Sequence, residues 1–144
     1  DVDAFKHAFE EKIRETLFFI PDCPILFTSA KEGYRLERLL TEAYELSRRL
    51  ARKLPTGPLN RTIQDRLQKR RPPAAKGKRV KIFYGVHTGN YPYRIRIYCN
   101  QAALLDESYR RYLQSACVED FRLKGCPVHF EIIGKTPRYG QKKP

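Results

Sequence analysis

The sequence predicts an α+β fold in which helices cover one face of a three-stranded sheet, preceded by a helix–strand–helix unit of a doubly wound α/β domain. The first observation behind this prediction is a pair of segments, 80–86 and 93–99, in which apolar and polar residues alternate. Such alternation around the turn residues Gly89-Asn90-Tyr91-Pro92 is typical of a half-buried antiparallel strand pair. The second is that apolar residues repeat at helical spacing before and after this pair. Because a hairpin alone is only marginally stable in water, we expect these helices to cover its apolar face.

Residues 1–53 predict two helices around one buried strand. Apolar residues recur every four positions from Phe5 to Leu17, with Asp3 as the expected N-cap, which is typical of an amphipathic helix. The apolar run Ile25-Leu26-Phe27 is typical of a strand buried on both faces of a parallel sheet. A polar loop and a second amphipathic helix follow. This unit is expected to close a doubly wound domain, whose loops at the carboxyl ends of strands bind ligands.

Residues 54–58 are a predicted linker, because Pro and Gly end one helix there and Thr and Pro can begin the next. Residues 59–134 predict a helix, the strand pair, a second helix capped by Asp106, and a third strand from Val128. The resulting order α-β-β-α-β is a KH-like arrangement. Residues 135–144 are basic and contain Pro and Gly, so we expect a disordered tail.

Positive charge is confined to one part of the chain. Residues 1–57 are electrically neutral, whereas residues 58–144 carry the whole formal net charge of +13. This division indicates two units with different functions, and the basic unit is expected to favour an anionic polymer or surface. No apolar run approaches the length of a membrane span, so we expect no membrane association.

The residue pattern predicts neither a metal site nor a catalytic centre. The four cysteines form no Cys-x-x-Cys pair, and the three histidines lack the spacing of zinc ligands. We therefore expect buried, reduced thiols in a cytoplasmic protein. The acidic pairs Asp106-Glu107 and Glu119-Asp120 are interpreted as a helix cap and a helix surface rather than as catalytic carboxylates.

The loop after the predicted buried strand resembles a nucleotide-binding motif. A strand that ends in Ser29-Ala30-Lys31, followed by Gly33 and an amphipathic helix, is similar to the last guanine-binding motif of Ras-like GTPase domains. The resemblance implies that the backbone amide of Ala30 contacts the guanine oxygen, that Ser29 supports the loop and that Lys31 packs beside the base. An ordinary loop between a strand and a helix is the alternative interpretation.

The basic part of the chain resembles the C-terminal domain of the EngA/Der family, bacterial GTPases with two tandem G domains and a KH-like domain. The resembling motifs are Leu59-Asn60-Arg61, Pro72-Pro73, Lys76-Gly77-Lys78-Arg79-Val80-Lys81-Ile82-Phe83-Tyr84, Ser108-Tyr109-Arg110-Arg111-Tyr112-Leu113 and Gly125-Cys126-Pro127-Val128. With the upstream Ser29-Ala30-Lys31 motif, the resemblance extends over nearly the whole chain. It implies that residues 1–53 are the C-terminal part of a Ras-like G domain.

The resemblance implies a cytoplasmic GTPase that assists maturation of the large ribosomal subunit, with GTP and Mg²⁺ as ligands of the parent protein. The chain lacks the P-loop, Asp-x-x-Gly and Asn-Lys-x-Asp motifs that bind phosphate, magnesium and guanine. We expect a fragment that begins just after the Asn-Lys-x-Asp motif, holds no cofactor and hydrolyses no GTP alone. The alternatives are a stand-alone RNA-binding module unrelated to a GTPase and a protein-docking regulatory domain.

A run of basic residues predicts contact with ribosomal RNA. Seven bases and no acid lie between residues 69 and 81, and the alternative interpretation is a solvated basic surface. KH modules clamp RNA with a Gly-x-x-Gly loop, which the chain lacks, so we expect recognition by charge and shape rather than by base readout. The candidate RNA-binding residues, including two on the second helix, are Lys69, Arg70, Arg71, Lys76, Lys78, Arg79, Lys81, Arg110 and Arg111.

The uncovered face of the sheet is a candidate docking surface. Strict alternation places under the helices the apolar residues Ile82, Tyr84, Ile95 and Ile97. The residues expected on the other face, and interpreted as a docking surface for neighbouring G domains of the same protein, are Phe83, Arg94, Arg96 and Tyr98. The alternative is that the aromatic residues stack unpaired bases. We expect a monomer whose partners are the large ribosomal subunit, its rRNA and its own G domains.

Overall fold

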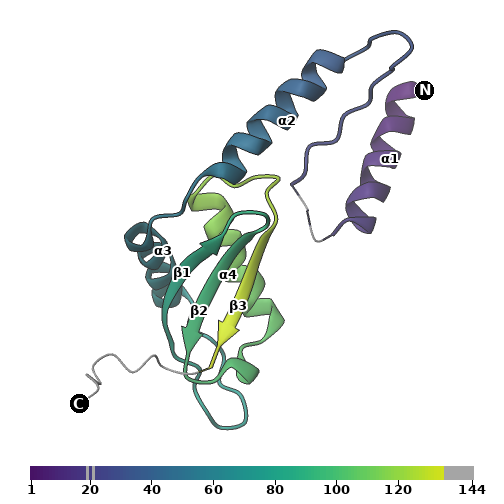
Figure 1. Cartoon of the computed structure of the whole chain (residues 1–144). Coiled ribbons are helices and arrows are strands. Elements are labelled where there is room, and N and C mark those ends of the chain that lie inside the picture. The colour runs from purple at the N-terminus through teal and green to yellow at the C-terminus, as the bar shows by residue number, and fades with distance from the viewer. Residues whose placement is uncertain (19, 21, 135–144) are drawn as a thin grey trace.

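The computed structural model of the chain describes residues 1–18, 20 and 22–134 (Figure 1). The predicted basic tail, residues 135–144, lies outside the described residues. In chain order, the helices and strands are α1 Val2–Thr16, α2 Leu36–Ala51, α3 Thr56–Lys69, β1 Ile82–Gly89, β2 Tyr93–Cys99, the short 3-10 helix Ala102–Leu104, α4 Glu107–Asp120 and β3 Val128–Ile133. Helix α3 begins inside the segment predicted as a linker, because Pro58 is tolerated in a first helical turn.

The three strands form one sheet in the order β1-β2-β3. Strand β1 is antiparallel to β2, whereas β3 is parallel to β2. Parallel neighbours require a crossover connection, and α4 supplies it. Helices α3 and α4 lie on one face of the sheet and contact each other (Figure 1). The order from α3 to β3 is therefore the predicted α-β-β-α-β arrangement, and the α+β fold class is confirmed.

The core lies between the sheet and these two helices. Alternate residues of β2 are buried, and they are Tyr93, Ile95, Ile97 and Cys99. The helices cover them with side chains that are also fully buried, namely Leu59 and Ile63 of α3 and Tyr109, Leu113 and Cys117 of α4. Complete burial of one large apolar side chain contributes about 1.5–3 kcal/mol, so this cluster supplies most of the stabilisation of the sheet domain.

Strand β1 contains a bulge, which shows that the predicted face of Tyr84 was wrong. The pairing of β1 with β2 shifts register between Ile82 and Tyr84. As a result Gly85 faces the core, where an added Cβ atom would lie 2.6 Å from Ile63 Cδ1. Glycine lets α3 approach the strand this closely, and the bulge at Phe83 turns Tyr84 toward the uncovered face.

Residues 1–51 contribute no buried side chain from their two helices, α1 and α2. The N-cap of α1 is Asp1, whose carboxylate accepts a hydrogen bond from the backbone amide of Asp3 at 3.1 Å, so the predicted cap lies inside the helix. The predicted strand at residues 25–27 is not formed. A strand needs a neighbour for its backbone hydrogen bonds, and these three residues pair with no other strand within the described part of the chain.

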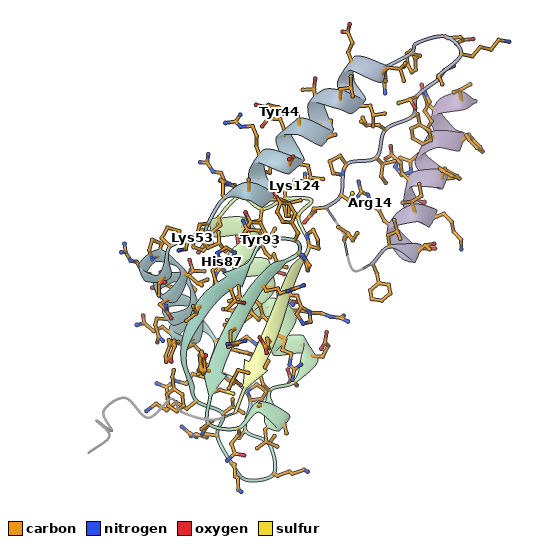
Figure 2. The ribbon with its side chains drawn as sticks, in the orientation of Figure 1. Arg14, Tyr44, Lys53, His87, Tyr93 and Lys124 are labelled. Carbon is orange, nitrogen blue, oxygen red and sulfur yellow. The ribbon has the colours of Figure 1, made fainter. Side chains whose placement is uncertain are left out.

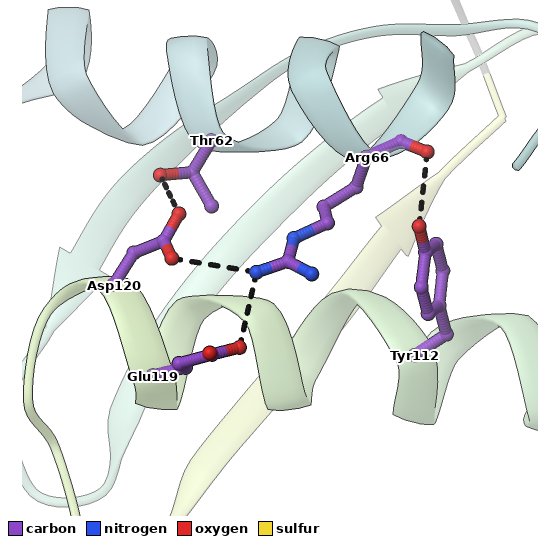
Figure 3. A network of polar contacts seen from close by, with 5 residues as sticks. All are labelled: Thr62, Arg66, Tyr112, Glu119 and Asp120. Carbon is purple, nitrogen blue, oxygen red and sulfur yellow. Dashed lines mark hydrogen bonds and ion pairs between the residues drawn. The ribbon is translucent and has the colours of Figure 1, made fainter. Parts of the chain in front are cut away.

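A polar network joins α3 to α4 beside the core (Figure 3). Arg66 Nη2 lies 3.1 Å from Glu119 Oε2 and 3.4 Å from Asp120 Oδ1, and the Thr62 hydroxyl donates to Asp120 Oδ2 at 2.8 Å. Desolvation lowers the pKa of Arg66, but the hydrogen bond that Arg66 donates to Glu119 and the charges of both carboxylates raise it overall. The acidic pair predicted as helix surface therefore holds the two helices together.

Candidate nucleic-acid interface

The basic segment, which we define as residues 69–81, connects the end of α3 to the start of β1. It lies at the end of the sheet opposite to α2 (Figure 1). All seven of its basic side chains are exposed. Within the described part of the chain, five of them form no ion pair with a carboxylate and no ring contact, and these are Lys69, Arg71, Lys76, Lys78 and Arg79.

The other two basic residues of the segment pack on aromatic rings. The guanidinium carbon of Arg70 lies 5.3 Å from the ring centroid of Tyr112 and 5.9 Å from that of Tyr109. The Tyr109 hydroxyl also donates to the backbone carbonyl of Arg70, and burial raises the pKa of this tyrosine to about 12. The ammonium of Lys81 lies 5.9 Å from the ring centroid of Phe83. Arg70 therefore contributes to packing at the base of the segment.

The two candidate residues on α4 also have partners inside the protein. Arg110 Nε donates to the backbone carbonyl of Leu105 at 3.1 Å. Arg111 Nε lies 3.3 Å from Glu107 Oε1, one helical turn earlier. Both can still meet phosphate through their remaining N–H groups, but their positive charge is less available than that of the five unpaired residues.

Residues 74–79, which we call the basic finger, form a small hairpin. The backbone amides of Ala75 and Lys78 each donate to the other residue's carbonyl at 3.0 Å. The two central residues, Lys76 and Gly77, have φ angles of 51° and 71°. Positive φ at both central positions is the geometry of a type I′ turn, the preferred two-residue hairpin turn. The finger therefore has a defined backbone shape.

Asn100 anchors the C-terminal side of the basic finger, and sequence reasoning missed it. Its side chain accepts from the backbone amide of Lys81 at 2.7 Å and donates to the carbonyl of Arg79 at 3.0 Å. Its own amide donates to the Lys81 carbonyl at 3.1 Å. The only signal in the sequence is an Asn directly after an alternating strand, which does not reveal a partner 19 residues earlier.

The open face, meaning the sheet face away from α3 and α4, combines aromatic and charged residues. The rings of Tyr84 and Tyr98 stack with centroids 4.7 Å apart. Arg96 Nε donates to Glu131 Oε2 at 3.0 Å. This hydrogen bond is the largest cause of the raised pKa of Arg96, and the hydrogen bond with Tyr98 is the next largest. Arg94 is exposed on the same face. Three of the four predicted docking residues therefore lie together with Tyr84, while Phe83 sits in the bulge.

The Ser29-Ala30-Lys31 loop forms a compact turn before α2. Ser29 and Tyr34 exchange two backbone hydrogen bonds of 3.2 and 3.0 Å, and the Ser29 hydroxyl accepts from the amide of Glu32 at 3.3 Å. Ser29 therefore supports the loop, while Ala30 and Lys31 are exposed.

The end of α2 is held against the sheet domain by reciprocal capping (Figure 2). The Asn90 side chain donates to the carbonyls of Leu50 at 2.6 Å and Arg52 at 3.0 Å. The Tyr93 hydroxyl donates to the carbonyl of Arg49 and lies 3.0 Å from that of Arg52. In return, Arg49 of α2 donates to the carbonyl of Lys124 at 2.9 Å, and Arg52, directly after α2, donates to that of Phe121 at 3.0 Å. The last carbonyls of a helix lack partners within it, so these contacts satisfy them.

The described residues contain no cluster of three or more His, Cys, Asp or Glu side chains that could hold a metal ion. Along the same residues, no helix combines the length and apolarity required to cross a membrane.

Comparison with known proteins identifies the part of the chain from α3 to β3. Residues 53–132 match a family model described as KH-domain-like of EngA bacterial GTPase enzymes, C-terminal. This range contains the basic segment, the open face and both helices that cover the sheet.

Curated relatives match residues of both parts of the chain. The chain is 33% identical over 130 residues to GTPase Der of Syntrophotalea carbinolica, which is 90% of this chain and 30% of the relative. It is 35% identical to GTPase Der of Alkaliphilus oremlandii over the same shares of the two chains. GTPase Der of Caldanaerobacter subterraneus subsp. tengcongensis is 34% identical over 89% of this chain and 29% of its own length. The chain therefore spans about 30% of the length of these relatives.

Proposed function

The chain belongs to the EngA/Der family, and from this premise we propose that it forms part of a GTP-hydrolysing protein that acts in assembly of the large ribosomal subunit. In this proposal, the parent protein binds GTP and Mg²⁺ and works as a monomer in the cytoplasm, without contacting a membrane. Membership in a GTPase family argues against the alternative of an RNA-binding module unrelated to GTPases.

The KH-like domain binds ribosomal RNA in this proposal through the basic segment. One observation carries it: five exposed cations, which pair with no carboxylate among the described residues, gather at one end of the sheet, and the segment contains no acid. Unpaired cations can neutralise phosphates without first breaking an internal ion pair. The lack of a Gly-x-x-Gly loop supports recognition by charge and shape.

The loop at Ser29-Ala30-Lys31 forms one wall of the guanine pocket in the parent protein. The geometry of the loop supports this role, because the Ser29 hydroxyl accepts a hydrogen bond within the turn and Ala30 is exposed to solvent. The pocket needs the other nucleotide-binding motifs of the family, so we expect this chain alone to bind GTP poorly and to hydrolyse none.

The open face docks on a neighbouring G domain of the same protein in this proposal. Its support is the mixture of stacked tyrosines with Arg94 and Arg96, which is typical of protein interfaces rich in Tyr and Arg. The docking residues are then Arg94, Arg96 and Tyr98, with Tyr84 added by the bulge and Phe83 at the margin.

Salt dependence tests the role of the basic segment. Changing Lys76, Lys78 and Arg79 together to Ala should weaken binding to ribosomal RNA and flatten the plot of log affinity against log salt concentration. Each lost phosphate contact should reduce the slope by roughly 0.7–0.9. Filter binding of the whole chain between low and physiological salt measures both quantities.

A matched control removes three cations elsewhere, by changing Lys6, Lys12 and Arg38 to Ala. This variant has the same formal net charge as the first but keeps the basic segment intact. Equal weakening by both variants, or an unchanged slope in the first, would exclude the basic segment as the RNA contact.

A further inference from the structure

We propose that the basic finger binds double-helical RNA as a preformed element. Its backbone shape contributes to the affinity as well as its positive charge. This inference rests on the proposed RNA binding and specifies the form of RNA that the KH-like domain takes. Three observations carry it: the conformation of the turn, the way both ends of the finger are held, and the side chains that the finger presents.

The turn restricts the finger to one backbone conformation. Lys76 and Gly77 both have positive φ, and the two hydrogen bonds between Ala75 and Lys78 close the turn. Gly77 adopts its φ of 71° without strain, whereas most residues with a side chain avoid this region. An added Cβ at Gly77 would meet no atom within 4 Å, so the requirement for glycine comes from the backbone alone.

Both ends of the segment that carries the finger are attached to the core. On the N-terminal side, the hydroxyl of the fully buried Tyr109 donates to the carbonyl of Arg70. On the C-terminal side, the Asn100 side chain bonds the backbone of Arg79 and Lys81, and Val80 is buried between them. The finger is therefore fixed in direction before RNA arrives, which lowers the entropy cost of binding.

The side chains of the finger favour the RNA backbone over the bases. Between residues 69 and 80 there is no aromatic side chain and no acid. Single-strand binding depends on stacking of bases on aromatic rings, which this segment cannot provide. Double-helical RNA is instead recognised by shape and by phosphate contacts across its grooves. Cations carried on a narrow hairpin whose backbone shape is defined suit such a regular array of phosphates.

Substitution of Gly77 separates backbone shape from charge. Gly77→Val keeps the net charge of +13 but places a β-branched residue at positive φ, so the turn should open. We expect its affinity for a mixed-sequence RNA duplex of 20 base pairs to fall by about three- to tenfold. Gly77→Asn is the matched variant, because Asn tolerates positive φ, and it should bind within about twofold of the unchanged chain.

Fluorescence anisotropy of the whole chain with the labelled duplex, and with a 20-nucleotide single strand of uridine, measures these affinities. Circular dichroism and melting temperature confirm that each variant is folded, which is expected since Gly77 is exposed and an added Cβ there meets no atom within 4 Å. The inference predicts tighter binding to the duplex than to the single strand, and a loss in Gly77→Val that Gly77→Asn does not show.

Several outcomes would overturn it. If Gly77→Val binds the duplex as tightly as the unchanged chain while the triple Ala variant of Lys76, Lys78 and Arg79 is weak, the finger supplies charge only. Equal affinity for the single strand would exclude recognition of the double helix. If the triple variant also binds unchanged, the proposed RNA contact itself fails, and this inference fails with it.

Discussion

At the scale of single residues, the domain depends on a few side chains that satisfy backbone groups of other elements. Asn60 on α3 donates to the carbonyl of Gly85 at 2.9 Å and accepts from its amide at 2.8 Å, so one amide side chain substitutes for a missing strand partner. Asn100 does the same for Arg79 and Lys81.

The buried cysteines are residues whose ionisation is suppressed by the fold. Burial raises the pKa of Cys99, Cys117 and Cys126 above the ordinary value of a thiol.

The buried thiol of Cys117 should make the domain less stable at alkaline pH. Burial raises its pKa to about 12, whereas the thiol of the unfolded chain ionises near pH 8.5. Above that pH, the unfolded state loses a proton that the folded state keeps, so the free energy of unfolding should fall by up to about 1.4 kcal/mol per pH unit. Urea unfolding at pH 8 and pH 10 measures the decrease.

The variant Cys117→Ala lacks this ionisation, so its stability should depend less on pH, although the loss of packing lowers its stability at both values. Cys23→Ala removes a partly exposed thiol and serves as the control. A pH dependence that is the same in Cys117→Ala and in the unchanged chain would show that this thiol ionises alike in both states.

At the scale of helices and strands, α2 connects the Ser29-Ala30-Lys31 turn at its N-terminal end to the sheet domain at its C-terminal end. The carbonyls at its C-terminal end bond Asn90 from the turn between β1 and β2 and Tyr93 from the start of β2. The helix has 16 residues, so it spans about 24 Å between these two ends. No residue of α2 is fully buried, so its attachment to the sheet domain depends on these capping contacts together with the partly buried Leu46 and Leu50, which pack against the core.

Removal of the Asn90 cap should loosen the last turn of α2. Asn90→Ala deletes two hydrogen bonds to helix carbonyls, each worth about 0.5–1.5 kcal/mol, and should destabilise this end of the helix by about 1–2 kcal/mol. Hydrogen exchange of the amides of residues 47–52 measures this local opening. Gln68→Ala, which shortens an exposed amide side chain on α3, is the control.

Faster exchange should be restricted to the end of α2, with the amides of β2 unchanged. Uniform acceleration across the sheet would mean that Asn90 stabilises the whole domain, and no acceleration would show that α2 is held by its apolar contacts through Leu46 and Leu50.

At the scale of the whole molecule, the candidate surfaces are distributed over a chain with one main core. Among the residues that the structure describes, every buried apolar residue lies between Leu54 and Phe130, within the KH-like part and its preceding segment. In contrast, α1 and α2 expose large apolar side chains, including Phe5, Leu40 and Tyr44. The Ser29-Ala30-Lys31 loop lies at the far end of α2, and the basic segment lies at the opposite end of the sheet (Figure 1).

The proposed docking role of the open face predicts how its variants behave. Tyr98→Ala should leave the affinity of this chain for the RNA duplex within about twofold, because a face that contacts a G domain adds no RNA contact. Anisotropy titration measures this affinity, and Arg79→Ala is the comparison that should weaken binding. A tenfold loss in Tyr98→Ala, with folding intact by circular dichroism, would assign the open face to RNA.

Apart from the strand predicted at residues 25–27, which is not formed, the sequence by itself determined the element types and the location of charge. Period-two alternation identified β1, β2 and β3, and helical spacing identified the four helices, because each pattern follows from which side of one element meets the core. Charge could be located for the same reason, since exposed Lys and Arg need no particular partner. The predicted cap Asp106 is confirmed, with its side chain accepting from the amide of Tyr109 at 2.7 Å.

Only the tertiary structure decided which residues share a face and which cations are unpaired. The face of Tyr84 depends on the bulge, and the bulge depends on how closely α3 approaches Gly85. The packing of Arg70 on two tyrosines and the anchor at Asn100 join residues far apart in the chain. Alternation describes one strand at a time, whereas these features arise from contacts between elements, and no local pattern specifies those contacts.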